Sequence, residues 1–156
     1  SCKLYSIDGV DIDFHFKYTW QNISKMYNEV ASGFGGTMAV GFILLSIDID
    51  SGTPSTALGP KMGMESTSLS RILKNMEEKE LIFRKPNPND GRGVLVCLTE
   101  FGVEKRDDAR EAVLLFNNTV FNKVNKKDLD AFFRVANSVN ELINNKEIFQ
   151  KDEANH

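Results

Sequence analysis

Apolar residues recur at steps of three and four in three long segments, and this spacing constrains the fold more than any other feature. In the clearest segment these residues are Phe16, Trp20, Ile23, Tyr27, Val30 and Phe34. Side chains at this spacing share one face of an α-helix. The segment therefore predicts a long amphipathic helix, capped by Asp13 and ended by the glycines at 33, 35 and 36.

The middle of the chain predicts shorter helices around a tight turn. Residues 38–48 are almost wholly apolar after a capping Thr37, which indicates a buried helix. A loop-forming stretch, 50–55, then precedes two helical segments, 55–62 and 65–80, separated by Gly63. The second segment has an apolar face formed by Leu69, Ile72, Leu73 and Met76. The polar face is small, hydroxylated and basic, and consists of Ser66, Thr67, Ser68, Arg71, Lys74 and Asn75. The pattern therefore predicts helix, glycine turn, helix.

Two short apolar runs, 81–85 and 94–98, predict strands. The residues between them, 86–93, are rich in turn formers and charges, and we expect a projecting connection too long for a tight hairpin. Thr99 can cap a further helix to about Val124, and a last amphipathic helix follows a break at 125–127. The fold class is therefore mainly α with a small β-ribbon, and the surplus of apolar helix at both ends predicts a dimer interface.

Size and composition predict one globular domain. The chain has 156 residues, 41% hydrophobic and 26% charged, close to the average of folded domains. Its longest apolar run, 38–47, is about half of the roughly 20 residues that span a bilayer, so we expect no membrane insertion. Cys97 lies in an apolar strand-like run, where a buried, inert thiol is expected. We expect a reduced protein of the bacterial cytoplasm.

Positive charge is concentrated in the middle of the chain. Residues 61–92 hold seven basic and five acidic side chains, whereas acids outnumber bases in 1–50 and in 93–156. A helix with short hydroxyl side chains and an arginine can enter a DNA major groove about 12 Å wide. A projecting ribbon that carries Arg92 can reach the minor groove. A solvated helix face is the alternative, but the tight turn and the basic ribbon together favour DNA recognition.

The order of the motifs resembles one family. The residues that carry the resemblance are Leu58–Leu73 (LGPKMGMESTSLSRIL), Met76–Ile82 (MEEKELI), Asp90-Gly91-Arg92 and Val94–Gly102 (VLVCLTEFG). Together they resemble the MarR family of winged helix-turn-helix transcriptional regulators, over nearly the whole chain. The resemblance implies one MarR-like domain, 1–156, with dimerisation helices in 13–48 and 100–149 and a winged DNA-binding lobe in 53–99. It also implies a homodimer that reads a pseudo-palindromic operator in double-stranded DNA.

The resemblance also implies roles for individual residues. Ser66, Thr67, Ser68 and Arg71 would lie on the DNA face of the recognition helix. Asp90 would orient the wing and Arg92 would enter the minor groove. From charge alone we add Lys74, Arg84 and Lys85 as phosphate contacts.

Three positions depart from the family pattern. Gly91 stands where the wing usually has a second arginine, which removes one phosphate contact from each subunit. Asn75 stands where arginine is frequent. Gly59-Pro60 replaces an alanine-rich helix start, which is tolerated because a first-turn proline lacks only an N–H that would be unpaired there.

The means of control is the least constrained feature. Members of the family sense small molecules or oxidants, and His15, Tyr18, Trp20 and Tyr27 could line an effector pocket; aromatic packing in the core and the dimer is the alternative that their helical spacing favours. Cys2 lies well before the first helix and is expected to be an ordinary thiol. With only His15 and His156 as histidines, we expect no metal site and no catalytic triad, hence no cofactor and no enzyme.

The sequence therefore predicts a repressor that occupies its operator and is released by an unknown small molecule. A second hypothesis is a winged-helix module for protein interaction or ligand binding without useful DNA affinity, which the net charge of −3, Gly91 and Asn75 support. A steep dependence of DNA binding on salt distinguishes the two.

Overall fold

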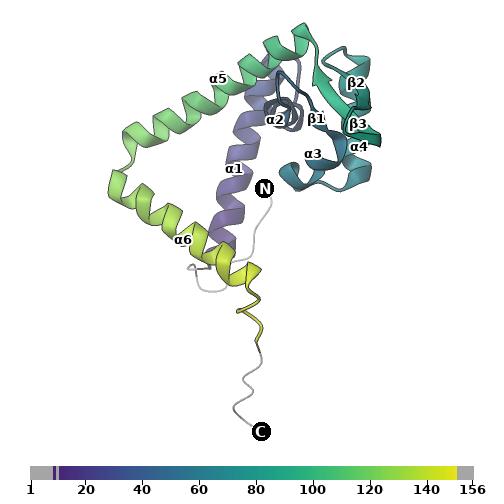
Figure 1. Cartoon of the computed structure of the whole chain (residues 1–156). Helices are drawn as coiled ribbons and strands as arrows, with labels where there is room; N and C mark the ends of the chain where they lie inside the picture. The colour runs from purple at the N-terminus through teal and green to yellow at the C-terminus, as the bar shows by residue number, and fades with distance from the viewer. Residues whose placement is uncertain (1–8, 10, 151–156) are drawn as a thin grey trace. The chain divides into compact units, whose positions relative to one another are not determined.

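The computed structural model describes Gly9 and residues 11–150. In chain order its elements are α1 (Ile12–Gly33), α2 (Met38–Ser46), β1 (Thr53–Pro54), α3 (Ser55–Met62), α4 (Ser66–Glu78), β2 (Ile82–Asn87), β3 (Asp90–Leu98), α5 (Glu100–Lys123) and α6 (Lys126–Asn144) (Figure 1). The chain divides into two compact units, residues 1–113 and 114–156. The mainly helical class with a small sheet is confirmed.

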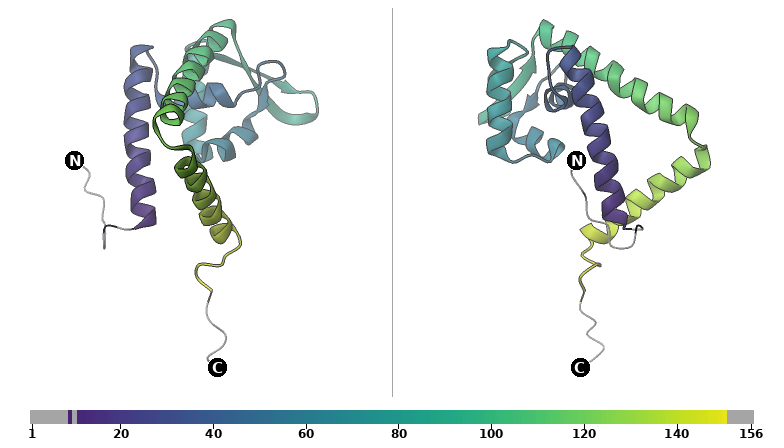
Figure 2. Two further views of the ribbon diagram at one scale, coloured as in Figure 1. Left: turned by 90° about the vertical axis from the view of Figure 1, so that its left-hand side faces the viewer. Right: turned by 180° about the vertical axis from the view of Figure 1, so that it is seen from behind.

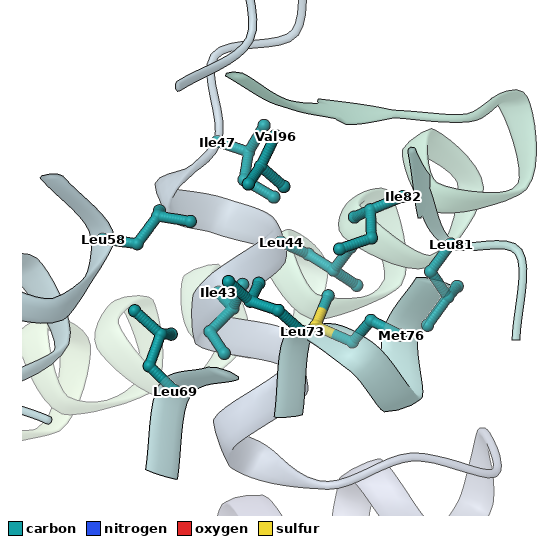
Figure 3. Packing of buried hydrophobic residues seen from close by; sticks show 10 residues of the cluster. All are labelled: Ile43, Leu44, Ile47, Leu58, Leu69, Leu73, Met76, Leu81, Ile82 and Val96. Atoms are coloured by element: carbon teal, nitrogen blue, oxygen red, sulfur yellow. The ribbon is translucent and has the colours of Figure 1, made fainter. Parts of the chain in front are cut away.

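The core of the first unit surrounds α2. Figure 3 shows its side chains, which come from α2, α3, α4, the sheet and the residues that directly follow α2 and precede β2: Ile43, Leu44, Ile47, Leu58, Leu69, Leu73, Met76, Leu81, Ile82 and Val96. Each fully buried aliphatic side chain contributes about 1.5–3 kcal/mol to folding. The nearly all-apolar sequence of α2 is explained by this central position, and α1 joins it through the edge-to-face pair Tyr27–Phe42, whose ring centroids are 5.7 Å apart.

The sheet is larger than the sequence pattern predicts. It has three antiparallel strands in the order β1-β3-β2, because Thr53 and Pro54 pair with Val96 and Leu95. The prediction of a long connection over 86–93 was wrong. Strand β2 extends to Asn87 and β3 starts at Asp90, so the two strands form an extended hairpin (Figure 2). Proline usually ends a strand, but Pro86 lies on the edge strand β2, which is where a sheet tolerates proline.

Side-chain caps mark the start of some of the described helices. The Val40 N–H donates to Thr37 Oγ1 (3.3 Å) and the Gly102 N–H donates to Thr99 Oγ1 (2.9 Å), which confirms both predicted caps. The cap predicted at Asp13 was wrong, since α1 begins at Ile12 with Asp11 as its N-cap. Asp13 instead lies in the first turn, where a carboxylate interacts favourably with the helix dipole.

The second unit holds the end of α5 and all of α6. The Lys127 N–H donates to Asn125 Oδ1 (2.8 Å) at the start of α6, and Phe121 contacts Phe133 with ring centroids 6.3 Å apart. No described residue of α6 is buried.

Among the described helices, none is long and apolar enough to cross a membrane alone. Only α1 and α2 taken together, bent by 87°, meet the length and composition needed.

Candidate nucleic-acid interface

Helices α3 and α4 meet at a tight turn. Gly63 adopts a left-handed conformation (φ 60°), and the Met64 N–H donates to the Gly59 carbonyl (3.1 Å). A side chain at Gly59 would lie 3.3 Å from the Met64 carbonyl oxygen, so this glycine allows close approach of the backbone. The predicted helix, glycine turn, helix arrangement is therefore present, with the predicted bounds of α3.

Helix α4 has one buried and one exposed face. Leu69, Leu73 and Met76 are buried in the core. The predicted recognition residues Ser66, Thr67, Ser68, Arg71 and Lys74 are all exposed. At 100° per residue, Thr67, Arg71 and Lys74 lie nearly opposite the buried residues. The structure thus brings a hydroxyl and two cations together on the outer face of α4.

The wing is held by short backbone contacts at its tip. The Arg92 N–H donates to Asp90 Oδ1 (3.1 Å) and the Asn89 N–H donates to Asn87 Oδ1 (3.0 Å). A side chain at Gly93 would lie 3.0 Å from Asp90 Oδ2, so glycine leaves room for the carboxylate. Arg92 itself is exposed. These bonds fix the backbone that carries its guanidinium.

The two predicted phosphate contacts on β2 differ in their surroundings. Arg84 and Lys85 are both exposed, and they point to opposite faces because consecutive strand residues alternate. Arg84 Nε lies 3.2 Å from Glu77 Oε2 of α4. Sequence reasoning missed Glu77, because the chain reversal between α4 and β2 that brings the two together leaves no periodic signal.

A cavity of about 160 Å³ lies in the first unit among α1, α2, α5 and the end of α4. Most of its lining is apolar and includes Val30, Phe34, Val40, Leu81, Phe101 and Val113; Lys79, Lys105 and Asp108 are its charged residues. Lys105 Nζ donates to the Phe34 carbonyl (3.4 Å), lies 3.8 Å from Asp108 Oδ2 and sits 5.9 and 5.6 Å from the ring centroids of Phe34 and Phe101.

Of the four residues considered for an effector pocket, Tyr27 alone lines this cavity. Burial raises the pKa of its phenol. His15, Tyr18 and Trp20 are exposed on the N-terminal half of α1. Lys79 and Lys105 were missed since they come from distant segments that only tertiary packing brings together.

The remaining predictions concern cysteine and metal. Cys97 is buried, as expected, and an added Cβ at Gly52 would lie 2.7 Å from its sulfur, so the loop before β1 covers it closely. Cys2 and His156 lie outside the described residues. Within the described part of the chain, no three His, Cys, Asp or Glu side chains form a group that could hold a metal ion.

Comparison with known proteins identifies the lobe. The model of the MarR family matches residues 37–94, from the start of α2 into β3. Over these residues the chain has the winged-helix lobe of a DNA-binding transcriptional regulator of the MarR type.

Individual relatives are distant but cover most of the chain. The HTH-type transcriptional regulator SarZ of Staphylococcus epidermidis is 27% identical over 112 residues, which are 72% of this chain and 73% of SarZ. Among solved structures, the MepR–DNA complex of S. aureus has a TM-score of 0.77 at 15% identity, covering 84% of this chain and 97% of that one. CouR of Rhodococcus jostii RHA1, bound to p-coumaroyl-CoA, has a TM-score of 0.74 at 20% identity, covering 84% and 92%. These structural likenesses show that the fold is that of MarR-family regulators.

Proposed function

We propose that the chain is a repressor that binds a pseudo-palindromic operator in double-stranded DNA as a homodimer. The observation that carries the proposal is the outer face of α4, where Thr67, Arg71 and Lys74 lie opposite the buried Leu69 and Leu73. A helix held by its apolar face can present its polar face to a major groove.

The proposed contacts follow from side-chain chemistry. On α4, Arg71 reads a guanine edge, and Ser66, Thr67 and Ser68 contact base edges or phosphates. At the wing, Arg92 enters the minor groove while Asp90 holds the turn. Lys74, Lys85 and Arg84 supply positive charge toward phosphates.

The dimer interface that we propose uses the exposed apolar residues of α1, α5 and α6. They include Trp20, Leu115, Phe121, Phe132, Leu142 and Ile143. Apolar surface of this extent on amphipathic helices is typical of an interface between subunits. A symmetric dimer also presents two recognition helices, which a pseudo-palindromic operator requires.

Fluorescence anisotropy tests the DNA contacts. Wild type, Arg71→Ala and Arg92→Ala are titrated onto fragments from around the protein's own gene and onto random DNA, from about 50 to 200 mM salt. Each arginine variant should lose about 1–3 kcal/mol of operator affinity. Arg134→Ala is the matched control, since it removes one exposed arginine from α6 rather than from the lobe. If no fragment binds better than random DNA, the alternative of a protein-interaction or ligand-binding module is favoured.

The effector, we infer, is a small molecule with an apolar ring and an anionic group. An apolar cavity of about 150 Å³ holds a benzene-sized ring, and this cavity measures about 160 Å³. Lys79 and Lys105 can pair with an anion there. The molecule would release DNA by fixing a spacing of the two recognition helices that does not fit the operator. The chain needs no further cofactor in this proposal.

Benzoate and its neutral analogue benzamide test this inference. Benzoate should weaken operator binding and benzamide should do so much less, because only benzoate gains the charged contact. Lys105→Met should abolish the difference between the two. Equal effects of both compounds in wild type would contradict the proposed anionic class.

We also propose a cytoplasmic location, where a bacterial regulator meets its DNA, and no enzymatic activity. Transcription regulators of this family are not enzymes in general. Incubation of the protein with labelled operator should leave the DNA intact by gel electrophoresis.

A further inference from the structure

The recognition helix and the wing are joined by one ion pair. Arg84 of β2 and Glu77 of α4 approach within 3.2 Å, with side-chain exposures of 36% and 47%. Among the described cations proposed to face DNA, which are Arg71, Lys74, Arg84, Lys85 and Arg92, Arg84 is the one with a carboxylate partner. This partner, Glu77, lies on the proposed recognition helix α4, whereas Arg84 lies on the wing.

The strand register explains why Arg84 meets α4. Arg84 lies opposite Val96 on β3, and Ile82 precedes it by two residues. Residues two apart on a strand, and residues directly opposite across a ladder, share one face of the sheet. Both Ile82 and Val96 are buried in the core. Arg84 therefore lies on the same face of the sheet as the buried Ile82 and Val96, but at the edge of the core. There it contacts Glu77 of α4.

The pair also lies at the root of the wing. Regular pairing of β2 with β3 runs from Ile82 opposite Leu98 to Pro86 opposite Val94, and the register shifts after Pro86. Beyond this point the ribbon carries Arg92. An attachment of Arg84 to α4 therefore fixes the last regular part of the ribbon before the tip.

We propose that Glu77 is a positioning residue for DNA recognition. Its carboxylate holds Arg84 and so sets the direction of the wing relative to the recognition helix, which places Arg92 at the minor groove while Arg71 occupies the major groove. This role rests on the DNA contacts of the proposed function. It differs from the assignment of Arg84 as a simple phosphate contact.

The two roles predict opposite signs for one substitution. Glu77→Gln removes a negative charge near the DNA, and by charge alone this strengthens binding. If Arg84 contacts phosphate on its own, loss of its competing carboxylate strengthens binding further. If Glu77 positions the wing, the same substitution weakens binding to the operator.

Glu78 provides the matched control. It is the next residue on α4, is exposed and has no ion pair among the described residues. Glu78→Gln makes the same change of charge on the same helix without touching Arg84. The ratio of operator affinities of E77Q and E78Q therefore isolates the pair from the general electrostatic effect.

The experiment measures operator and random-DNA affinities of wild type, E77Q, E78Q and the swapped variant E77R/R84E by anisotropy. We expect E77Q to bind the operator about three- to tenfold more weakly than E78Q, with random-DNA binding unchanged. The swapped variant, which keeps the net charge and restores the pair, should recover most of this loss. Thermal unfolding of each variant shows that the fold is kept.

A second readout tests whether Glu77 acts through the wing. In an R92A background, E77Q should cost less operator affinity than in wild type, because the contact that it positions is already lost. Operator binding by E77Q as tight as by E78Q, or equal losses with and without Arg92, would overturn the positioning role alone. Failure of wild type to prefer any fragment over random DNA would overturn the proposed function and this role with it.

Discussion

Helices α4 and α6 have similar amphipathic sequences but different surroundings. The apolar face of α4 is buried, with Leu69, Leu73 and Met76 in the core of the lobe. The apolar face of α6 is not: Phe132 and Ile143 are 50% and 55% exposed, and none of its described residues is buried. An amphipathic pattern thus predicts that a helix buries its apolar face. It does not predict whether residues of the same chain or of another chain pack against that face. The lobe buries the apolar face of α4 itself, whereas for α6 we propose that a second subunit does so.

We expect the largest loss of stability from a side chain that is added where two backbone segments of the first unit lie very close together. A side chain at Gly102 would overlap the Leu81 carbonyl oxygen, where the start of α5 lies against the turn between α4 and β2. Because the Leu81 atoms at this contact belong to the backbone, they cannot move aside cheaply. Gly102→Ala should therefore destabilise the protein by about 3 kcal/mol or more, measured by urea unfolding.

Gly41→Ala is the matched control for this prediction. It too replaces a helical glycine of the first unit, but its new Cβ would meet Ala109 Cβ at an ordinary 3.5 Å. Alanine is the better helix former by about 1 kcal/mol, so the substitution should be neutral or stabilising. Similar destabilisation by both would mean that the contact at Leu81 is not the cause.

A charge on the exposed face of α6 should separate the subunits and spare the lobe. In Phe132→Asp a carboxylate replaces a half-exposed ring that we assign to the dimer interface. The dimer should weaken by about 2 kcal/mol or more, measured by analytical ultracentrifugation. Asn137→Asp adds the same charge at an exposed polar position of α6 and should leave the dimer intact. A monomeric wild type would remove the basis of the comparison between α4 and α6.

The two helices also end alike, which allows a smaller test. Glu80 after α4 and Lys146 after α6 both adopt positive φ, 60° and 56°. In each case the next N–H donates back into the helix, from Leu81 to Met76 (3.0 Å) and from Glu147 to Leu142 (3.0 Å). Glycine is the favoured residue at such a position, because a side chain is strained there.

Glu80→Gly should therefore stabilise the protein by about 1 kcal/mol. Lys146→Gly should give only a few tenths, since the exposed end of α6 can unfold locally without unfolding the core. Thermal unfolding measures both. Glu80→Ala removes the same charge but keeps the strain, so stabilisation by alanine as large as that by glycine would assign the effect to charge.

Local sequence signals predicted the helices and two of their caps, because each of these depends on near neighbours. Thr37 and Thr99 cap as expected, and Gly63 makes the turn before α4. Features that depend on distant neighbours were missed: β1 becomes a strand only because β3 lies beside it, and Pro86 is tolerated only because β2 is an edge strand.

The same distinction holds for the candidate site. Exposure of Arg71 and Lys74 followed from helical periodicity. The pairing of Arg84 with Glu77 and the approach of Lys105 to Phe34 follow from tertiary packing, which no local pattern records.

The smallest test concerns the loop between α2 and β1. Asp48 accepts hydrogen bonds from the Ser51 N–H (2.8 Å), the Ser51 hydroxyl (2.9 Å) and the Asp50 N–H (3.0 Å). These bonds, those from Ser51 first, lower the pKa of its carboxyl below the ordinary 3.8. A carboxyl with a lowered pKa in the folded state adds stability above its unfolded pKa, and this stability is lost as pH falls through the folded value.

Asp48→Ala should therefore lower the unfolding temperature near neutral pH, and its difference from wild type should shrink below pH 3.8. Asp130→Asn on α6 is the control, because it breaks only an exposed pair with Lys126 (3.3 Å). Such a pair contributes at most about 0.5 kcal/mol. A pH-independent deficit in the Asp48 variant would mean that lost geometry, rather than the carboxylate charge, holds this loop. Packing alone would then order the loop between α2 and β1. The difference between the lobe and α6 would be explained by burial, with no contribution from these polar contacts.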